Sequence, residues 1–155
     1  MARIKIDLPE QFSFSTSIPV RITDLNYGNH VGNDAVLSII HEARMQFLKT
    51  FGYTEMEFAG VGMIMSDVAI EFKNELFYRD TVIASVAATE FSKFGFDIYY
   101  KLETLRHFGK LNAQDDKKVL AAVAKTGMVC FDYTKKKIVS IPEAAREKLQ
   151  QAIGN

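Results

Sequence analysis

The side chains of this sequence whose types and spacing could carry chemistry lie in one polar segment, residues 21–33. Asp24 offers a carboxylate, and Asn26 offers an amide that can orient a water molecule or a substrate. His30 follows in the same segment and can gain or lose a proton near neutral pH. Gly28 and Gly32 permit the backbone to approach a ligand closely. These residues predict a polar loop that is suited to proton transfer and ligand binding.

The segment leads directly into a predicted helix that must be buried. Asn33 is a favourable N-cap residue, and Asp34 places a carboxylate in the first turn, where the helix dipole favours it. Gly52 is a suitable stop. Apolar residues cover most of the circumference between these ends, at Val36, Leu37, Ile39, Ile40, Ala43, Phe47 and Leu48.

Alternating apolar and polar residues predict β-strands before and after this helix. Residues 12–22 favour a strand, and Pro19 places it at a sheet edge or at a bulge. Residues 81–91 are rich in strand-forming types. The strand over 63–72 would bury Ile64, Val68, Ile70 and Phe72 and expose Met63, Asp67 and Glu71. The strand over 94–104 would bury Phe94, Phe96, Ile98, Tyr100 and Leu102 and expose Asp97, Lys101 and Glu103.

The last third of the chain predicts one more long strand and a terminal helix. Residues 106–118 are polar and predict an exposed loop. Residues 119–133 combine a helix-compatible start with a strand-like end, and small residues that let a sheet approach a helix favour a strand throughout. Residues 138–142 predict a short strand, after which Pro142 opens an amphipathic helix that would cover the surface.

Size and composition indicate one domain spanning residues 1–155. Nineteen basic and nineteen acidic residues give no net charge, so nothing in the composition points to nucleic acid. The single cysteine, Cys130, fits a reducing cytoplasm, and spacings typical of a structural metal are absent from the sequence. The sequence contains no apolar stretch long enough to cross a membrane. We therefore expect no metal and no cofactor.

The order of predicted elements favours an α+β domain in which one curved antiparallel sheet wraps a long central helix. One sheet around one helix leaves a strand edge and one side of the helix uncovered. A second copy of the chain would cover both, so we expect a homodimer or a tetramer.

The segment also resembles a known family. The pattern Asp24-x-Asn26-x-x-x-His30-Val31-x-Asn33, followed by Glu42-Ala43-Arg44, is similar to the hot-dog-fold acyl-CoA thioesterases of the 4-hydroxybenzoyl-CoA thioesterase group. The strand-turn-strand segment 72–80 and the sequence Ile141-Pro142-Glu143 before the last helix also match. The resemblance covers nearly the whole chain and implies the hot-dog fold and hydrolysis of an acyl-CoA or acyl carrier protein thioester.

The resemblance further implies that a backbone N–H near Val31, Gly32 or Asn33 binds the thioester carbonyl at the start of the helix, with Tyr27 among the substrate-binding residues. A carboxylate would then activate water or attack directly. The family usually has an aspartate where this chain has Asn26, and an amide can neither take a proton nor act as that nucleophile.

Three residues could replace the missing aspartate. Asp24 is close in sequence, although its carboxylate could instead hold the loop. His30 could transfer the proton or only hydrogen-bond the loop backbone. Glu42 lies about 13 Å along the helix from its N-terminus at about 1.5 Å per residue, so it could serve only the site of a partner subunit. A structural Glu42 is an equally good interpretation.

Other chemistries are less well supported. A serine hydrolase lacks its G-x-S-x-G motif, and Cys130 fits a small core residue better than a nucleophile. Two functional alternatives remain: a catalytically weak acyl-thioester binding protein, and hydration of an enoyl thioester. Lys93, Arg106, Lys110 and residues 135–137 could meet coenzyme A phosphates, but the sequence assigns none of them.

Overall fold

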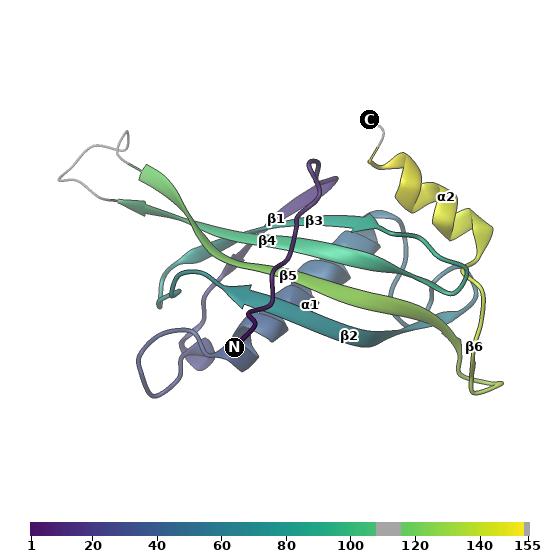
Figure 1. The fold of residues 1–155 in the computed structure, drawn as a ribbon, viewed down its shortest axis with the longest axis horizontal. Helices are drawn as coiled ribbons and strands as arrows, with labels where there is room; N and C mark the ends of the chain where they lie inside the picture. The colour runs from purple at the N-terminus through teal and green to yellow at the C-terminus, as the bar shows by residue number, and fades with distance from the viewer. Residues whose placement is uncertain (108–115, 154–155) are drawn as a thin grey trace.

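The computed structural model describes residues 1–107 and 116–153, which form one antiparallel sheet, a long helix and a short helix (Figure 1). The sheet order is β1-β3-β4-β5-β2, with β6 paired to β5. The predicted α+β arrangement is confirmed, because α1 lies against one face of the curved sheet (Figure 1). The bounds are β1 Phe14–Pro19, α1 Asn33–Thr50, β2 Gly62–Phe72, β3 Thr81–Thr89, β4 Gly95–His107, β5 Asp116–Asp132, β6 Lys137–Ile138 and α2 Glu143–Gln151.

Helix α1 begins at Asn33, one residue earlier than predicted, because its N-cap is Gly32, and no side chain caps it. The prediction of Asn33 as the N-cap was therefore wrong by one residue. A Cβ on Gly32 would lie 2.5 Å from Asp34 Oδ1, so glycine leaves room for the carboxylate of the first turn. Gly52 follows the helix with φ +80°, which confirms it as the stop. The sheet-facing side of α1 is fully buried, including Ile40 and Phe47.

Strand β4 supplies the centre of the core and follows the predicted alternation closely. Phe96, Ile98, Tyr100 and Leu102 are all buried. Phe94 was predicted to be inward but is exposed, because it lies in the turn between β3 and β4, which the Ser92 N–H closes on the Gly95 carbonyl at 2.8 Å. The alternation of buried and less buried side chains therefore begins only where β4 starts to pair with β5, at Gly95.

The predicted faces of strand β2 are wrong before a β-bulge and right after it. Its pairing with β5 shifts between Met65 and Asp67, which marks a β-bulge. A bulge inserts one residue and so changes which side chains face the core. Before the bulge, Met63 was predicted to be outward but is buried and pairs with the buried Cys130. After the bulge, Val68, Ile70 and Phe72 pair with the buried Thr126, Ala124 and Ala122, so they lie on the core side as predicted; Val68 and Phe72 are exposed because β2 is the edge strand.

Several other boundaries differ from the prediction. The first strand is shorter than residues 12–22 and gives way to a 3₁₀ turn at Ile22–Asp24, while its edge position is confirmed. The strand interpretation of residues 119–133 is confirmed by β5. Part of the predicted loop 106–118 is strand, since β4 and β5 pair out to His107 and Asp116, and residues 108–115 lie outside the described residues. Residues 139–142 are not strand, because the ladder with β5 ends at Ile138; α2 follows Pro142.

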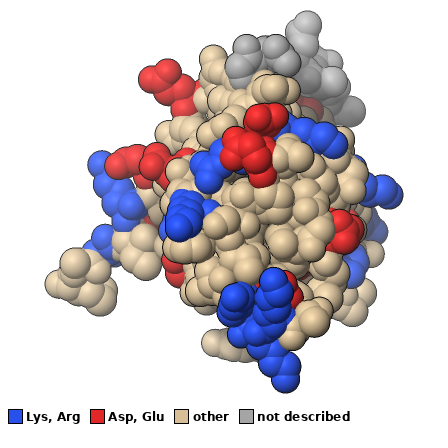
Figure 2. Space-filling view, turned by 90° about the vertical axis from the view of Figure 1, so that its right-hand side faces the viewer, with Lys and Arg blue, Asp and Glu red and all other residues tan. Residues whose placement is uncertain are grey.

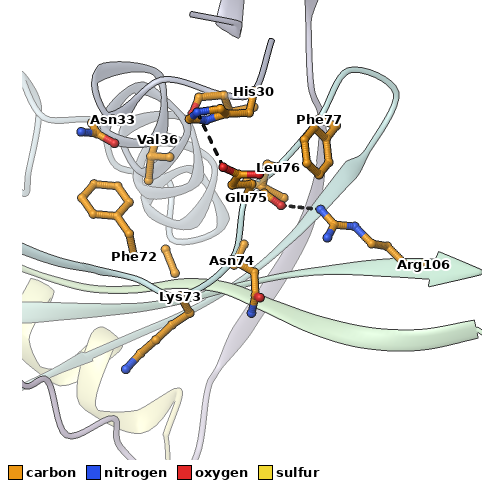
Figure 3. Close-up of a pocket in the computed structure, with 13 residues that line it drawn as sticks. His30, Asn33, Val36, Phe72, Lys73, Asn74, Glu75, Leu76, Phe77 and Arg106 are labelled. Atoms are coloured by element: carbon orange, nitrogen blue, oxygen red, sulfur yellow. Dashed lines mark hydrogen bonds and ion pairs between the residues drawn. The ribbon is translucent and has the colours of Figure 1, made fainter. Parts of the chain in front are cut away.

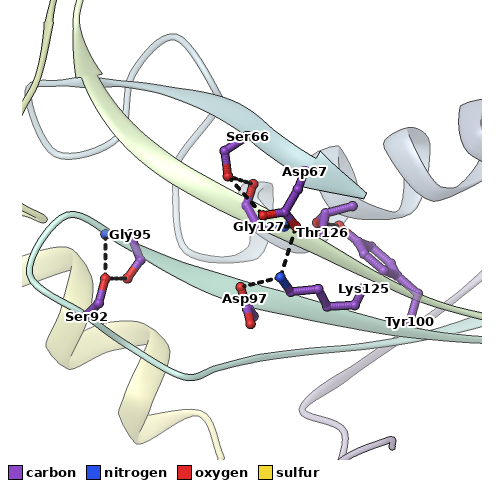
Figure 4. A network of polar contacts seen from close by, with 9 residues as sticks. All are labelled: Ser66, Asp67, Ser92, Gly95, Asp97, Tyr100, Lys125, Thr126 and Gly127. Atoms are coloured by element: carbon purple, nitrogen blue, oxygen red, sulfur yellow. Dashed lines mark hydrogen bonds and ion pairs between the residues drawn. The ribbon is translucent and has the colours of Figure 1, made fainter. Parts of the chain in front are cut away.

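The N-terminal residues cross the face of the sheet opposite α1 (Figure 1), and the Ile6 N–H donates to Glu71 Oε2 at 2.7 Å. Polar side chains occupy that outer face. Lys125 Nζ lies 2.9 Å from Asp67 and 3.2 Å from Asp97 (Figure 4), and its hydrogen bond lowers the pKa of Asp67. On the side of the molecule in Figure 2, acidic and basic side chains alternate with uncharged surface.

Candidate active site

The polar loop is held in shape by Asp24, whose side chain is buried. Asp24 Oδ2 accepts the backbone N–H of Arg21 at 2.8 Å, and Oδ1 accepts the Arg21 guanidinium at 3.1 Å. This hydrogen bond raises the pKa of Arg21. The carbonyl of Asp24 accepts the N–H of Gly32 at 3.0 Å, which closes the loop onto the start of α1. The carboxylate of Asp24 is thus committed to the loop itself.

Asn26 and His30 are hydrogen-bonded to each other at the two ends of a tight turn. The Asn26 N–H donates to the His30 carbonyl at 2.9 Å, and Asn26 Oδ1 accepts the Gly28 N–H at 2.8 Å. The amide oxygen of Asn26 is therefore used locally, which leaves its Nδ2 group as a donor. Tyr27, at the tip of the turn, is fully exposed.

The N-terminus of α1 keeps unused hydrogen-bond donors. The N–H of Val31 donates to the Leu76 carbonyl at 2.8 Å, and that of Gly32 is taken by Asp24. Among the described residues, the backbone N–H groups of Asn33, Asp34 and Ala35 have no acceptor. Because the helix dipole adds positive potential at this end, Asn33 offers the first N–H that can bind a carbonyl oxygen or an anion.

A pocket of about 510 Å³ opens beside this helix end (Figure 3). His30 and Asn33 line it from the loop and the helix, and the connection between β2 and β3 forms the opposite side. Apolar side chains make up much of the wall, namely Val31, Val36, Phe72, Leu76, Phe77, Ala121 and Ala122. The pocket therefore places an apolar wall next to polar groups that can donate and accept protons.

His30 faces a carboxylate that sequence reasoning did not single out. Its Nδ1 lies 3.2 Å from the Val31 carbonyl, so in the neutral ring Nδ1 carries the hydrogen and Nε2 keeps its lone pair. Nε2 lies 3.8 Å from Glu75 Oε1 (Figure 3). Glu75 comes from the β2–β3 connection, and no local pattern in the sequence links it to His30.

Arg106, a candidate for coenzyme A phosphates, lines the pocket. Its guanidinium lies over the ring of Phe77, donates to the Glu75 carbonyl and lies 3.1 Å from Asp80 Oδ2. These contacts tie β4 to the β2–β3 connection. Lys110 lies outside the described residues.

Glu42 lies in a different place from His30. It lines a second groove of about 480 Å³ between β1 and α1, together with Arg21 and Asp24. Its carboxylate is exposed and accepts Gln46 Nε2 at 2.7 Å. Within the single chain, the candidate acidic residues Asp24 and Glu42 share this groove, whereas Asn33 and His30 line the other pocket.

Other reactive groups are buried or dispersed. Burial raises the pKa of the Cys130 thiol to about 11, so it is not activated as a nucleophile. In the described part of the chain, no three His, Cys, Asp or Glu side chains are grouped to hold a metal ion. None of the described helices is both long and apolar enough to span a membrane.

Comparison with known proteins agrees with this architecture. The family model for the thioesterase-like superfamily matches residues 20–149, and the chain belongs to this superfamily. The hot-dog fold expected from the sequence is therefore confirmed, and membership supports thioester hydrolysis as the general class of chemistry. No curated protein matches the chain.

Solved structures of similar fold cover nearly the whole chain. A thioesterase superfamily protein from Jannaschia sp. CCS1 has a TM-score of 0.77 and 18% identity, over 94% of this chain and 86% of that one. A thioesterase complexed with coenzyme A and Zn from Thermus thermophilus has a TM-score of 0.75 and 18% identity, over 95% and 99%. A 1,4-dihydroxy-2-naphthoyl-CoA thioesterase from Synechocystis has a TM-score of 0.71 and 19% identity, over 92% and 96%.

Proposed function

We propose that this protein hydrolyses an acyl-CoA thioester in the pocket at the N-terminus of α1, with an acyl carrier protein thioester as the alternative substrate. The proposal rests on one arrangement: the free N–H of Asn33, the Nε2 of His30 and an apolar wall line the same pocket. A thioester needs these three features, because its acyl group is apolar, its carbonyl oxygen becomes negative and its attacking water must lose a proton.

The apolar wall would hold the acyl group while the carbonyl oxygen accepts the Asn33 N–H. As water attacks, negative charge develops on that oxygen, and the helix dipole stabilises it. Val31 and Gly32 contribute by fixing the backbone that presents this N–H. Tyr27, exposed at the tip of the loop, would contact the coenzyme A portion of the substrate.

His30 would take the proton from water through Nε2 and return it to the leaving thiolate. Asn26 would orient that water through Nδ2, since its Oδ1 is bound to Gly28. Asp24 would hold the loop. These assignments give the proton to His30, the basic side chain of the loop that lines the pocket.

A second copy of the chain is part of the proposal. Strand β2 ends the sheet and exposes Met65, Val68 and Phe72, which is unusual for an unpaired edge. Pairing of two chains would cover this strand, and Glu42 of a second subunit would be a further candidate for proton transfer. We propose that the protein is a homodimer or a tetramer. We also propose that it lies in a reducing cytoplasm, because it has a single cysteine.

The test is thiol release from a panel of short, long and aromatic acyl-CoAs by wild type, Asn26→Asp and His30→Gln. We expect wild type to turn over one class of substrate and His30→Gln to lose most of that activity. Acyl carrier protein thioesters of the best acyl group would then identify the carrier. Inertness of wild type and Asn26→Asp with every substrate would contradict thioester hydrolysis.

A catalytically weak acyl-thioester binding protein is the second candidate, and Asn26 is the observation that favours it. An amide at this position cannot act as the carboxylate that the family pattern usually has. Binding of acyl-CoA by calorimetry without turnover, together with a gain of activity in Asn26→Asp, would support this alternative over the enzyme.

A further inference from the structure

We propose that Glu75 is a positioning residue for His30, so that the carboxylate missing at residue 26 is replaced by one from the connection between β2 and β3. This inference rests on the proposed function and deepens it. Glu75 would compensate the positive charge that the ring gains when it accepts a proton, and it would hold the protonated ring through the hydrogen on Nε2.

The orientation of the His30 ring gives the first argument. Its Nδ1 faces the Val31 carbonyl at 3.2 Å and its Nε2 faces Glu75 Oε1 at 3.8 Å (Figure 3). The carbonyl holds one side of the ring, so the nitrogen with the lone pair points toward the carboxylate and the pocket. A protonated ring would then lie between two oxygen atoms, a favourable place for a cation.

The fixed position of the connection gives the second argument. The Leu76 carbonyl accepts the Val31 N–H at 2.8 Å, which joins the connection to the residue after His30. Arg106 donates to the Glu75 carbonyl from β4. Asn74 Nδ2 donates to the Leu120 carbonyl of β5 at 2.7 Å. Hydrogen bonds to three separate parts of the chain therefore fix the backbone around Glu75. A side chain that positions a second group requires such a fixed backbone.

The other charged side chains near the pocket already have partners. Glu71 accepts the Ile6 N–H and pairs with Lys73, and Asp80 accepts the Phe77 N–H and pairs with Arg106. Within the described part of the chain, His30 is the partner of the Glu75 carboxylate. The neighbouring carboxylates thus make structural contacts, whereas the carboxylate of Glu75 pairs with His30.

The reaction balances with these two residues. The oxygen of water bonds to the thioester carbon while His30 Nε2 takes one proton, and Glu75 remains ionised beside the imidazolium. The tetrahedral intermediate then breaks its C–S bond, and His30 returns the proton to the sulfur. One water is consumed, and the products are a carboxylic acid and a thiol.

The first measurement compares Glu75→Gln and Glu75→Asp with wild type on the best acyl-CoA of the panel. Glu143→Gln is the matched control, because Glu143 is an exposed carboxylate paired with Arg146 at 3.7 Å on α2, away from the pocket. We expect Glu75→Gln to lower kcat about tenfold with KM within about twofold, the pattern of a lost transition-state interaction. Glu75→Asp should recover at least part of kcat. An unchanged kcat in Glu75→Gln would overturn the proposal.

The second measurement is independent of turnover and keeps this inference separate from the proposed function. The ring ¹⁵N shifts of the histidines, recorded by NMR at one fixed pH, report the environment of each ring nitrogen. Because His30 Nε2 faces Glu75, we expect the His30 ring shifts to change in Glu75→Gln, with those of His41 and His107 unchanged. Unchanged His30 shifts would overturn the pairing, whereas an inert wild type with altered His30 shifts would contradict only thioester hydrolysis.

Discussion

Two histidine–glutamate pairs lie on or near α1, and only one of them faces the candidate site. His41 Nε2 lies 3.2 Å from Glu55, closer than the 3.8 Å between His30 and Glu75. Glu55, however, also binds Arg44 at 2.5 Å, and the Arg44 side chain is only 5% exposed. The shorter pair therefore belongs to a structural network.

That network continues into the core. Arg44 Nη1 donates to the hydroxyl of Tyr100 at 3.4 Å, and this hydroxyl lies 2.9 Å from Thr126 Oγ1. Burial raises the pKa of Tyr100 and keeps it neutral. Glu55 is thus needed to balance a buried guanidinium.

The comparison teaches that the other partners of a charged pair, rather than its length, distinguish structure from function. His30 and Glu75 line a pocket with free helix N–H groups, whereas His41 lies in the groove between β1 and α1 that Asp24 and Glu42 also line. The two cavities have similar volumes, about 510 and 480 Å³, so size alone does not identify the site.

The largest expected effect separates the two histidines by activity. His30→Gln should lower kcat/KM for the best acyl-CoA by about 100-fold, a typical loss for a general base. His41→Gln, its matched control, should stay within about twofold, because His41 does not line the pocket of His30. Thiol release measured under identical conditions decides this, and an equal loss in both variants would break the comparison.

The next effect separates the two glutamates by stability. Glu55→Gln leaves the buried Arg44 without its charged partner, and because Glu55 is 23% exposed we expect a loss of about 2 kcal/mol, below the range for a fully buried pair. Glu75→Gln should change the free energy of unfolding by less than about 0.5 kcal/mol, as is usual for an exposed residue. Urea unfolding measures both values, and a larger loss in Glu75→Gln would assign Glu75 to the fold.

A smaller effect concerns the groove between β1 and α1. Asp24→Asn removes a charge-assisted hydrogen bond to Arg21, so the free energy of unfolding should fall by about 1.5 kcal/mol. Glu42→Gln in the same groove should cost less than about 0.5 kcal/mol, since Glu42 is exposed. Equal stability of the Asp24 variant and wild type would show that the loop does not depend on this carboxylate.

The smallest effect is the pH dependence of the unfolding free energy that comes from Cys130, a residue outside both histidine–glutamate pairs. Because the folded pKa of Cys130, about 11, is above its unfolded value, the folded state is favoured by protonation. This contribution is complete below the unfolded pKa and is lost as pH rises from about 9 to about 11. From pH 8 to pH 10, the unfolding free energy of wild type should fall by about 1 kcal/mol more than that of Cys130→Ala.

Thioester turnover in Cys130→Ala should match wild type across the same panel of acyl-CoAs. A large loss of activity in this variant would move the chemistry from His30 to the thiol. An identical decline in stability for both proteins would instead mean that the thiol is less protected than its burial indicates.

Much of the fold could be predicted because each element carries a local pattern. The inward residues of β4, from Phe96 to Leu102, repeat every second position, and α1 is apolar around most of its circumference. The faces of β2 could be predicted only for the part after its bulge, since the bulge following Met65 reverses the alternation without a marker in the sequence.

The candidate site was predictable only in part, because only some of its residues belong to a local sequence pattern. Asn26, His30 and Asn33 stand out because they are close in sequence and precede a helix. Glu75 does not, because nothing local distinguishes it from other exposed glutamates.

The sequence by itself determined the order of elements, the polar loop and the start of the helix, because local alternation and helix-starting chemistry act over a few residues. Only the tertiary structure decided which carboxylate meets His30. The hydrogen bond between Val31 and Leu76 brings the β2–β3 connection to the helix end. The carboxylates of Asp24 and Glu42 accept hydrogen bonds from Arg21 and Gln46 in the groove between β1 and α1. Contacts between distant segments depend on how the sheet packs around α1, and no local pattern encodes them.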